Sequence, residues 1–163
     1  MQKLWAPWRT EYIHNPGKGC LFCETLKKDD FKKVLILEKR EKAFTIMNRF
    51  PYNNGHVMVA PIRHVASLES LDDDEILQIN ALLVRAIKSI TATMKAQGFN
   101  IGINQGHVAG AGVVDHVHAH LVPRWRGDTN FMPVLSETKV ISEALLETYE
   151  KIKQGLKRLD NLK

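Results

Sequence analysis

Two different spacings of apolar residues divide this chain into predicted strands and helices. Short apolar runs at residues 34–37, 43–47, 56–62 and 99–104 are bounded by charged or turn-forming residues, which is typical of β-strands. The charged residues at 38–42 separate the first two runs and favour a β-hairpin. These runs predict a sheet built mainly from antiparallel strands.

Residues 71–97 form the clearest predicted helix. Acidic residues from Asp72 to Glu75 crowd its first turn, where the helix dipole favours negative charge, and Gly98 ends it. An apolar stripe recurs every three or four positions and is expected to face the core: Ile76, Ile79, Leu83, Ala86 or Ile87, Ile90 and Met94. A similar spacing predicts a second helix over residues 142–159.

The composition fits one globular domain. The 163 residues are 44% hydrophobic and 25% charged, and they contain no internal repeat. We predict a single α+β domain over residues 1–163, with an antiparallel sheet of about five or more strands, one long helix and one C-terminal helix. Residues 1–19, which are rich in aromatic and turn-forming residues, are expected to form an irregular arm.

Charge and apolar content limit the function classes. A net charge of +5 suits an anionic partner such as a nucleotide, but the scattered basic residues argue against nucleic-acid binding. No apolar run has the length of a signal peptide or a membrane span, so we expect a cytoplasmic protein without membrane contact. In that compartment the pair Cys20 and Cys23 favours metal or redox chemistry over a structural disulfide.

The most informative stretch is residues 116–125, which carries a histidine at every second position in an apolar strand predicted from Val113 onward. On a regular strand, His116, His118 and His120 face one side about 6.6 Å apart. The outer two are then roughly 13 Å apart, too far to share one tetrahedral metal ion. His118 alone has an imidazole on each side, which suits a nucleophile or a base.

A glycine-rich loop at residues 106–112 precedes the histidines. Such loops let main-chain N–H groups surround an oxyanion. A neutral imidazole that attacks phosphorus gives a covalent intermediate, and in-line transfer needs donors around the equatorial oxygens. Besides the loop amides, His116, His120 and Arg124 are candidate donors.

These motifs resemble those of the histidine-triad (HIT) superfamily of nucleotide hydrolases and transferases. Three segments carry the resemblance: residues 48–61, 104–106 and 116–122. It spans about residues 20–131, and the segments at 4–13 and 123–131 are similar to the diadenosine tetraphosphate phosphorylase-like branch. The resemblance implies an antiparallel sheet with two helices that pairs into a homodimer.

The resemblance also implies a role for each matching residue. His118 matches the nucleophile that takes the nucleoside monophosphate, and His116 and His120 match its triad neighbours. His56 matches the histidine that orients the nucleophile.

Substrate contacts follow from the same resemblance. Asn48 matches a ribose or base contact, and Asn104 matches a polar contact near the scissile phosphate. The stretch that wraps the α-phosphate corresponds to Ala111, Gly112, Val113 and Val114. Many relatives carry Gln and then Ser or Thr at positions 112 and 113, so here only main-chain donors remain.

Some HIT proteins bind zinc, and the matching ligands in this chain are Cys20, Cys23, His64 and His116. Two thiolates and two imidazoles suit a tetrahedral structural site. The alternative is that Cys20 and Cys23 are reduced thiols and that His64 is a surface residue. No organic cofactor is expected.

We therefore expect an enzyme that cleaves dinucleoside polyphosphates, such as diadenosine tetraphosphate, through a nucleotidyl-His118 intermediate. The acceptor is phosphate or water, and the arm around Trp5 and Trp8 favours phosphate. Two alternatives stay open, a nucleoside phosphoramidate hydrolase and a non-catalytic nucleotide-binding module.

Overall fold

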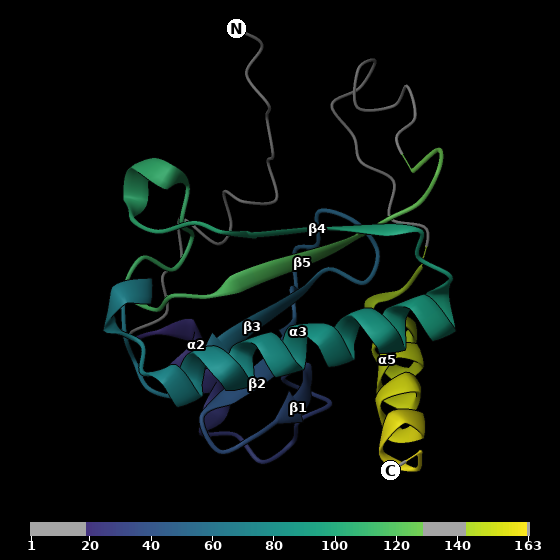
Figure 1. The fold of residues 1–163 in the computed structure, drawn as a ribbon, viewed down its shortest axis with the longest axis horizontal. Helices are drawn as coiled ribbons and strands as arrows, with labels where there is room; N and C mark the ends of the chain where they lie inside the picture. The colour runs from purple at the N-terminus through teal and green to yellow at the C-terminus, as the bar shows by residue number, and fades with distance from the viewer. Residues whose placement is uncertain (1–18, 129–142, 163) are drawn as a thin grey trace, which may run out of the picture.

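The computed structural model describes residues 19–128 and 143–162, which form one antiparallel sheet with helices (Figure 1). The sheet order is β1-β2-β3-β5-β4, with β1 at Ile36–Lys39, β2 at Ala43–Met47, β3 at Val57–Pro61, β4 at Gly98–Ile103 and β5 at Ala119–Arg124. The long helix α3 spans Asp73–Met94, and the C-terminal helix α5 spans Leu145–Asp160. The predicted α+β class and both helices are confirmed. Most of the arm predicted at residues 1–19 lies outside the described residues.

Helix α3 covers one face of the sheet and begins at a capping box. The Asp72 side chain accepts from the Glu75 N–H, and the Glu75 side chain accepts from the Asp72 N–H. Most of the predicted stripe is buried, but Ile76 is 42% exposed, so its assignment to the core was wrong. Ile76 lines a cavity next to β4, whereas Leu82 is fully buried in the core.

Helix α5 packs across α3 and β1 at the end of the sheet away from α2 (Figure 1). The Ser89 hydroxyl donates to the Ile152 carbonyl at 2.7 Å, and the Tyr149 hydroxyl donates to the Ile36 carbonyl at 3.0 Å. Gly155 lies against Ser89, where a side chain would collide. One buried hydrogen bond and one glycine thus fix the crossing of the two helices, and the second bond ties α5 to β1.

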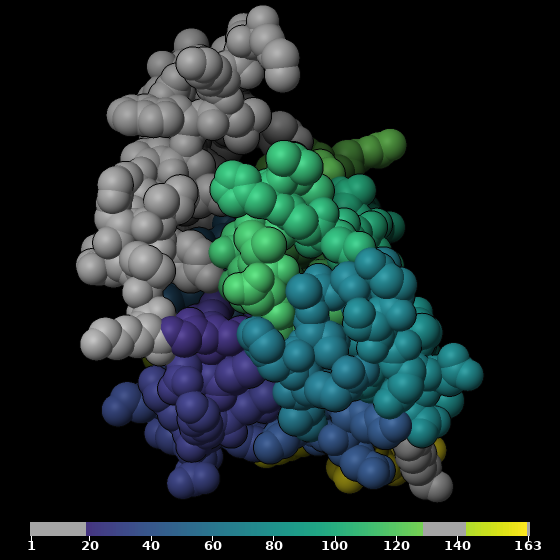
Figure 2. All heavy atoms as spheres, turned by 90° about the vertical axis from the view of Figure 1, so that its left-hand side faces the viewer, coloured from purple at the N-terminus to yellow at the C-terminus, as the bar shows by residue number. Residues whose placement is uncertain are grey.

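The other end of the sheet gathers short elements: α2 at Leu21–Leu26, and 3₁₀ turns at Leu68–Ser70 and His107–Ala109. Cys20 is the N-cap of α2, and Cys23 lies within that helix. In Figure 2, the α2 segment in purple and the loop between β4 and β5 in green lie next to each other. Residues far apart in the sequence therefore meet at this end.

The histidine strand starts later than its alternation predicted. Strand β5 begins at Ala119 rather than Val113, because the Val117 N–H donates to the Val65 carbonyl at 2.7 Å. That bond ties the chain to the segment after β3 before the ladder with β4 begins at Ala119. None of the described helices is long and apolar enough to cross a membrane.

Candidate active site

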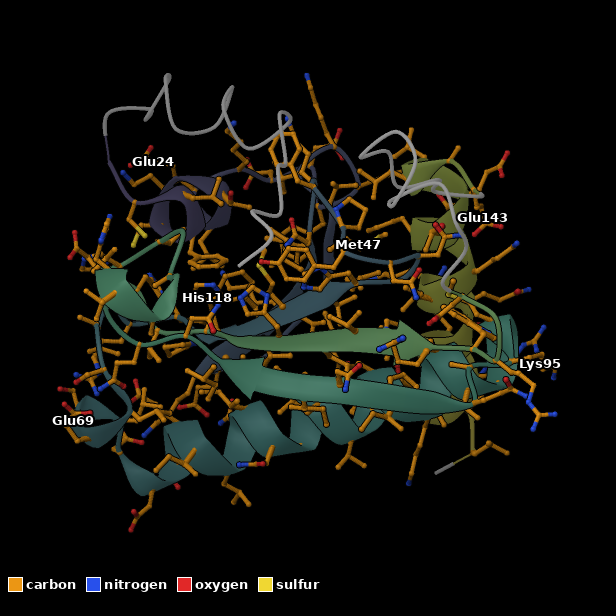
Figure 3. All side chains as sticks on the ribbon, turned by 90° about the horizontal axis from the view of Figure 1, so that it is seen from above. Glu24, Met47, Glu69, Lys95, His118 and Glu143 are labelled. Carbon is orange, nitrogen blue, oxygen red and sulfur yellow. The ribbon has the colours of Figure 1, made fainter. Side chains whose placement is uncertain are left out.

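His118 lies at the start of β5 with one ring nitrogen fixed by the main chain (Figure 3). Its Nδ1 lies 2.9 Å from the carbonyl oxygen of His116. A carbonyl only accepts, so Nδ1 carries the proton and Nε2 keeps its lone pair. The ring is 4% exposed, and this burial lowers the pKa of His118. The result is a neutral imidazole whose free nitrogen is Nε2.

His120 packs against His118 with ring centroids 4.8 Å apart at 67°. Its Nδ1 lies 3.0 Å from Nε2 of His56, which precedes β3 and is fully buried. His56 was expected to orient the nucleophile, and it reaches His118 through His120. The turn between β2 and β3 therefore contacts the triad through the hydrogen bond between His56 and His120.

Asn48 organises the turn that leads to His56. Its side-chain oxygen accepts from the Phe50 N–H at 2.9 Å, and its Nδ2 lies 3.4 Å from Nδ1 of His56. The Tyr52 N–H also donates to this Nδ1, at 3.1 Å. Contact of Asn48 with a ribose or base stays a prediction.

Phe22 of α2 lies behind the triad and was not foreseen as part of the site. Its ring is fully buried, with centroids 5.0 Å from both His116 and His118. The sequence feature that could have pointed to Phe22 is its position between Cys20 and Cys23. These two cysteines bring α2 against the histidines. Phe22 supplies the apolar wall that desolvates His118.

The glycine-rich loop joins β4 to the triad. Ile103 pairs with Ala119, so Asn104 follows at the register position beside His118. Gly106 and Gly110 have φ of 84° and 85°, a conformation that favours glycine. The Gln105 side chain accepts from the Leu68 N–H at 2.9 Å and donates to Glu69 at 3.0 Å, which anchors the loop.

The phosphate-wrapping stretch predicted at residues 111–114 lies within this loop. Ala111 is buried, and its N–H bonds to the Gly106 carbonyl. Gly112 and Val114 are exposed, and Val113 is half-buried. Contact of this stretch with a phosphate stays a prediction.

Arg124 lies at the far end of β5 from His118. Its Nε donates to Asp128 at 2.6 Å, and its guanidinium also donates to Asn100 at 2.8 Å. The Asp128 carboxylate holds the pKa of Arg124 above its ordinary value. The structure thus places Arg124 in a polar cluster away from the triad, and its contact with substrate stays a prediction.

The four predicted metal ligands come together beside the triad. The ligand atoms of Cys20, Cys23, His64 and His116 all lie within 4.8 Å of one another. Nδ1 of His116 is 3.3 Å from Cys20 Sγ and 3.7 Å from Cys23 Sγ. Nδ1 of His64 is 3.4 Å from Cys23 Sγ.

These distances fit a tetrahedral ion. Zinc bonds of about 2.3 Å to sulfur and 2.05 Å to nitrogen place neighbouring ligand atoms about 3.6 Å apart in a tetrahedron. Nε2 of His116 lies 2.9 Å from the Pro61 carbonyl, so it carries the proton and leaves Nδ1 as the ligand atom. Burial lowers the pKa of His116, which keeps the imidazole neutral. The residues present fit a bound zinc.

Comparison with known proteins agrees with the histidine motif. Residues 30–127 match the HIT domain family. The chain belongs to this family. It is 35% identical over 158 residues to AP-4-A phosphorylase of Mycobacterium tuberculosis, covering 91% of this chain and 80% of that HIT relative. It is also 30% identical to adenosine 5'-monophosphoramidase HNT1 of Candida albicans, covering 89% of this chain and 96% of the yeast protein.

A solved HIT structure shares the fold. A Zn-bound histidine triad family protein from Mycobacterium smegmatis superposes with a TM-score of 0.73 at 25% identity. The match covers 89% of this chain and 98% of that protein. The HIT family fold predicted from the sequence is therefore confirmed.

Proposed function

We propose that this HIT protein cleaves dinucleoside polyphosphates of the diadenosine tetraphosphate type through a covalent nucleotide on His118. One observation carries the proposal. Nδ1 of His118 donates a hydrogen bond to the His116 carbonyl, so Nε2 is the nitrogen with the lone pair. The surroundings keep this ring neutral, as a nucleophile requires. Similarity to the AP-4-A phosphorylase supports the substrate class.

In the first step, Nε2 of His118 attacks the α-phosphorus of one nucleoside. The N–P bond forms while the P–O bond to the rest of the polyphosphate breaks, and the electron pair leaves on that oxygen. Diadenosine tetraphosphate would release ATP and leave AMP on the histidine. In the second step, an acceptor oxygen attacks phosphorus and the N–P bond breaks, which restores His118.

We assign His120 the role of stabilising the charge that develops in these steps. Its Nδ1 faces His56, which leaves the proton on Nε2 as the proposed donor to a phosphoryl oxygen. Main-chain N–H groups of residues 112–114 are the other proposed donors, together with Asn104 beside His118.

Product analysis separates the two acceptors. Incubation with diadenosine tetraphosphate and inorganic phosphate should yield ADP and ATP if phosphate accepts the nucleotide, and AMP and ATP if water does. We propose phosphorolysis, supported by the AP-4-A phosphorylase similarity. Phosphate-independent production of AMP would instead identify a hydrolase, and absence of turnover would favour a nucleotide-binding module.

A second candidate activity is hydrolysis of nucleoside phosphoramidates. The similarity to the adenosine 5'-monophosphoramidase favours it, since the same adenylyl-histidine would form. Adenosine 5'-phosphoramidate should be assayed beside diadenosine tetraphosphate. The ratio of the two kcat/KM values decides between the activities.

We propose that Cys20, Cys23, His64 and His116 hold a structural zinc. Four protein ligands complete a tetrahedron and leave no open position, so the ion would supply rigidity rather than Lewis-acid chemistry. The Zn-bound histidine triad relative supports this proposal. Both cysteines are free thiols, the state that a reducing cytoplasm maintains, and we propose that location.

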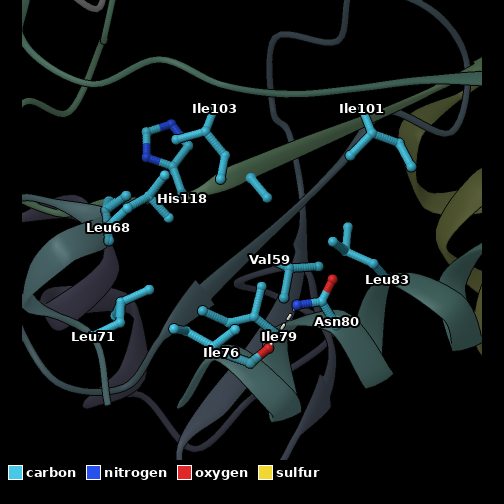
Figure 4. Close-up of a pocket in the computed structure, with 12 residues that line it drawn as sticks. Val59, Leu68, Leu71, Ile76, Ile79, Asn80, Leu83, Ile101, Ile103 and His118 are labelled. Atoms are coloured by element: carbon cyan, nitrogen blue, oxygen red, sulfur yellow. Dashed lines mark hydrogen bonds between the residues drawn. The ribbon is translucent and has the colours of Figure 1, made fainter. Parts of the chain in front are cut away.

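We also propose a homodimer formed through β4. Among the described strands β4 is at the sheet edge, and Ile101 and Ile103 are 53% and 37% exposed on it. They border a cavity of about 200 Å³ between β4 and α3 that also reaches Ile76 (Figure 4). A strand edge beside an apolar surface suits antiparallel pairing with the same strand of a second copy.

A further inference from the structure

Tyr52 contacts the two histidines that stand beside the nucleophile. Its ring centroid lies 4.7 Å from that of His56 at an interplanar angle of 32°. The same ring is stacked on His120, at 5.9 Å and 29°. One aromatic side chain from the turn between β2 and β3 therefore spans a histidine pair that joins two strands.

The main chain of Tyr52 fixes the tautomer of this pair. Its N–H donates to Nδ1 of His56 at 3.1 Å, so Nδ1 is the unprotonated nitrogen and Nε2 carries the proton. Nε2 of His56 then donates to Nδ1 of His120 at 3.0 Å. It follows that His120 carries its own proton on Nε2, the proposed donor to a phosphoryl oxygen.

This chain of hydrogen bonds depends on the orientation of each ring. A tilt of the His120 ring out of its present plane would turn Nδ1 away from the His56 proton and weaken this hydrogen bond. His120 is only partly buried, unlike His56, so less of the core holds that plane. The stacked ring of Tyr52 is in contact with it.

We propose that Tyr52 is a positioning residue that acts through His56 and His120, holding the His120 ring so that its Nε2 proton faces the reacting phosphate. The inference deepens the proposed function and rests on it. We assign the role to the aromatic ring, which makes both histidine contacts.

The kinetic test compares two substitutions in the full-length protein, with diadenosine tetraphosphate and inorganic phosphate as substrates. Tyr52→Leu should lower kcat by about 10- to 100-fold, with a change in KM of less than about 3-fold, since misplaced groups act on the transition state. Tyr52→Phe keeps the ring and should retain kcat within about 2-fold. Equal losses in the two variants, or an unchanged kcat in Tyr52→Leu, would overturn the proposal.

A double-mutant cycle tests whether Tyr52 acts through His120. In a His120→Asn background, Tyr52→Leu should lower kcat by less than about 2-fold further, because the group that it positions is gone. Full additivity of the two losses would show that Tyr52 acts elsewhere. Thermal unfolding of each variant identifies losses that come from misfolding.

A spectroscopic test does not depend on turnover and so separates failure of this inference from failure of the proposed function. Nitrogen-15 NMR of the imidazoles at pH 8, with His120 assigned by its loss in His120→Asn, should show His120 protonated on Nε2 in the wild type and in Tyr52→Phe. Tyr52→Leu should show a mixture of tautomers. An unchanged His120 spectrum in Tyr52→Leu contradicts the inference whatever the substrate is.

Discussion

The main-chain carbonyl of His116 accepts a hydrogen bond from Nδ1 of His118, with 2.9 Å between nitrogen and oxygen. The side chain of His116 lies beside the thiols of Cys20 and Cys23. One residue thus contacts the two thiols with its ring and His118 with its backbone. Anything that holds the His116 ring also fixes the carbonyl that sets the tautomer of His118. The Cys/His cluster and the triad are therefore coupled through this one residue.

Replacement of the nucleophile should abolish turnover without unfolding the protein. We expect His118→Ala to lower kcat for diadenosine tetraphosphate by at least about 1,000-fold, since no other group forms the covalent intermediate. Initial rates and circular dichroism check this. Activity above about 1% of the wild type, in a folded variant, would refute the covalent mechanism.

Metal removal should weaken both the fold and the activity. Purified protein is expected to contain about one zinc per chain, and a chelator should lower its Tm and kcat because four ligands that tie α2 to the triad lose their common partner. Elemental analysis measures the zinc. Cys23→Ser should reduce zinc content, whereas the exposed His107→Ala should not. A metal-free, fully active preparation would remove the zinc proposal.

The β4 edge should control the oligomeric state. Ile101→Lys is expected to convert the dimer to a monomer, because it places a charge at the centre of an apolar interface. Light scattering after gel filtration measures the mass. Leu162→Lys is the control, since Leu162 is 82% exposed beyond the end of α5. A dimer that survives Ile101→Lys would place the interface elsewhere.

The ion pair between the buried Glu75 and the exposed Arg63 should make stability depend on pH. Hydrogen bonds from Arg63 hold the pKa of Glu75 below its usual value of 4.5, so the unfolded chain takes up this proton first as the pH falls. The stabilisation is present above pH 4.5 and disappears as the pH falls through the lower, folded-state pKa.

Urea unfolding of the wild type and Glu75→Gln from pH 7 to pH 3 tests this dependence. The free energies of unfolding should differ most at pH 7 and converge in acid. Asp73→Asn, an exposed change in the same helical turn, serves as the control. A constant difference between wild type and Glu75→Gln at every pH would contradict the assignment.

The crossing of α3 and α5 should not tolerate a methyl group at Gly155. In an open helix, Gly→Ala stabilises by about 1 kcal/mol. Here the added Cβ would collide with Ser89 Oγ and lie 3.1 Å from Ser89 Cα, so we expect Gly155→Ala to lower the free energy of unfolding by about 1–3 kcal/mol. Denaturant unfolding measures it. Gln154→Ala, at an exposed position, should leave the free energy of unfolding nearly unchanged. A Gly155→Ala protein that is more stable than the wild type would mean that the two helices move apart to accommodate the methyl group.

The sequence alone determined most of the secondary structure and the family. Short apolar runs placed the main strands, and an apolar spacing of three to four placed both long helices, because these patterns depend only on which side of an element is buried. The histidine spacing and the resemblance pointed to the family and to His118 as the nucleophile, a role that stays a prediction. The same reasoning misplaced the start of β5 and the burial of Ile76, since neither depends on local pattern.

Tertiary structure decided how the rings are connected. The surroundings of the His116 ring and the residue that His56 contacts are set by groups more than 50 positions away in the chain, such as Pro61 and Cys20. The protonated nitrogen of His118 is set by a neighbouring carbonyl, but only the folded backbone brings that carbonyl to Nδ1. A one-dimensional pattern cannot specify them, because a histidine of either tautomer fits the same alternation. Three histidines that look equivalent in the sequence thus acquire different surroundings only once the chain has folded: the thiols for His116, a main-chain carbonyl for His118 and the ring of His56 for His120.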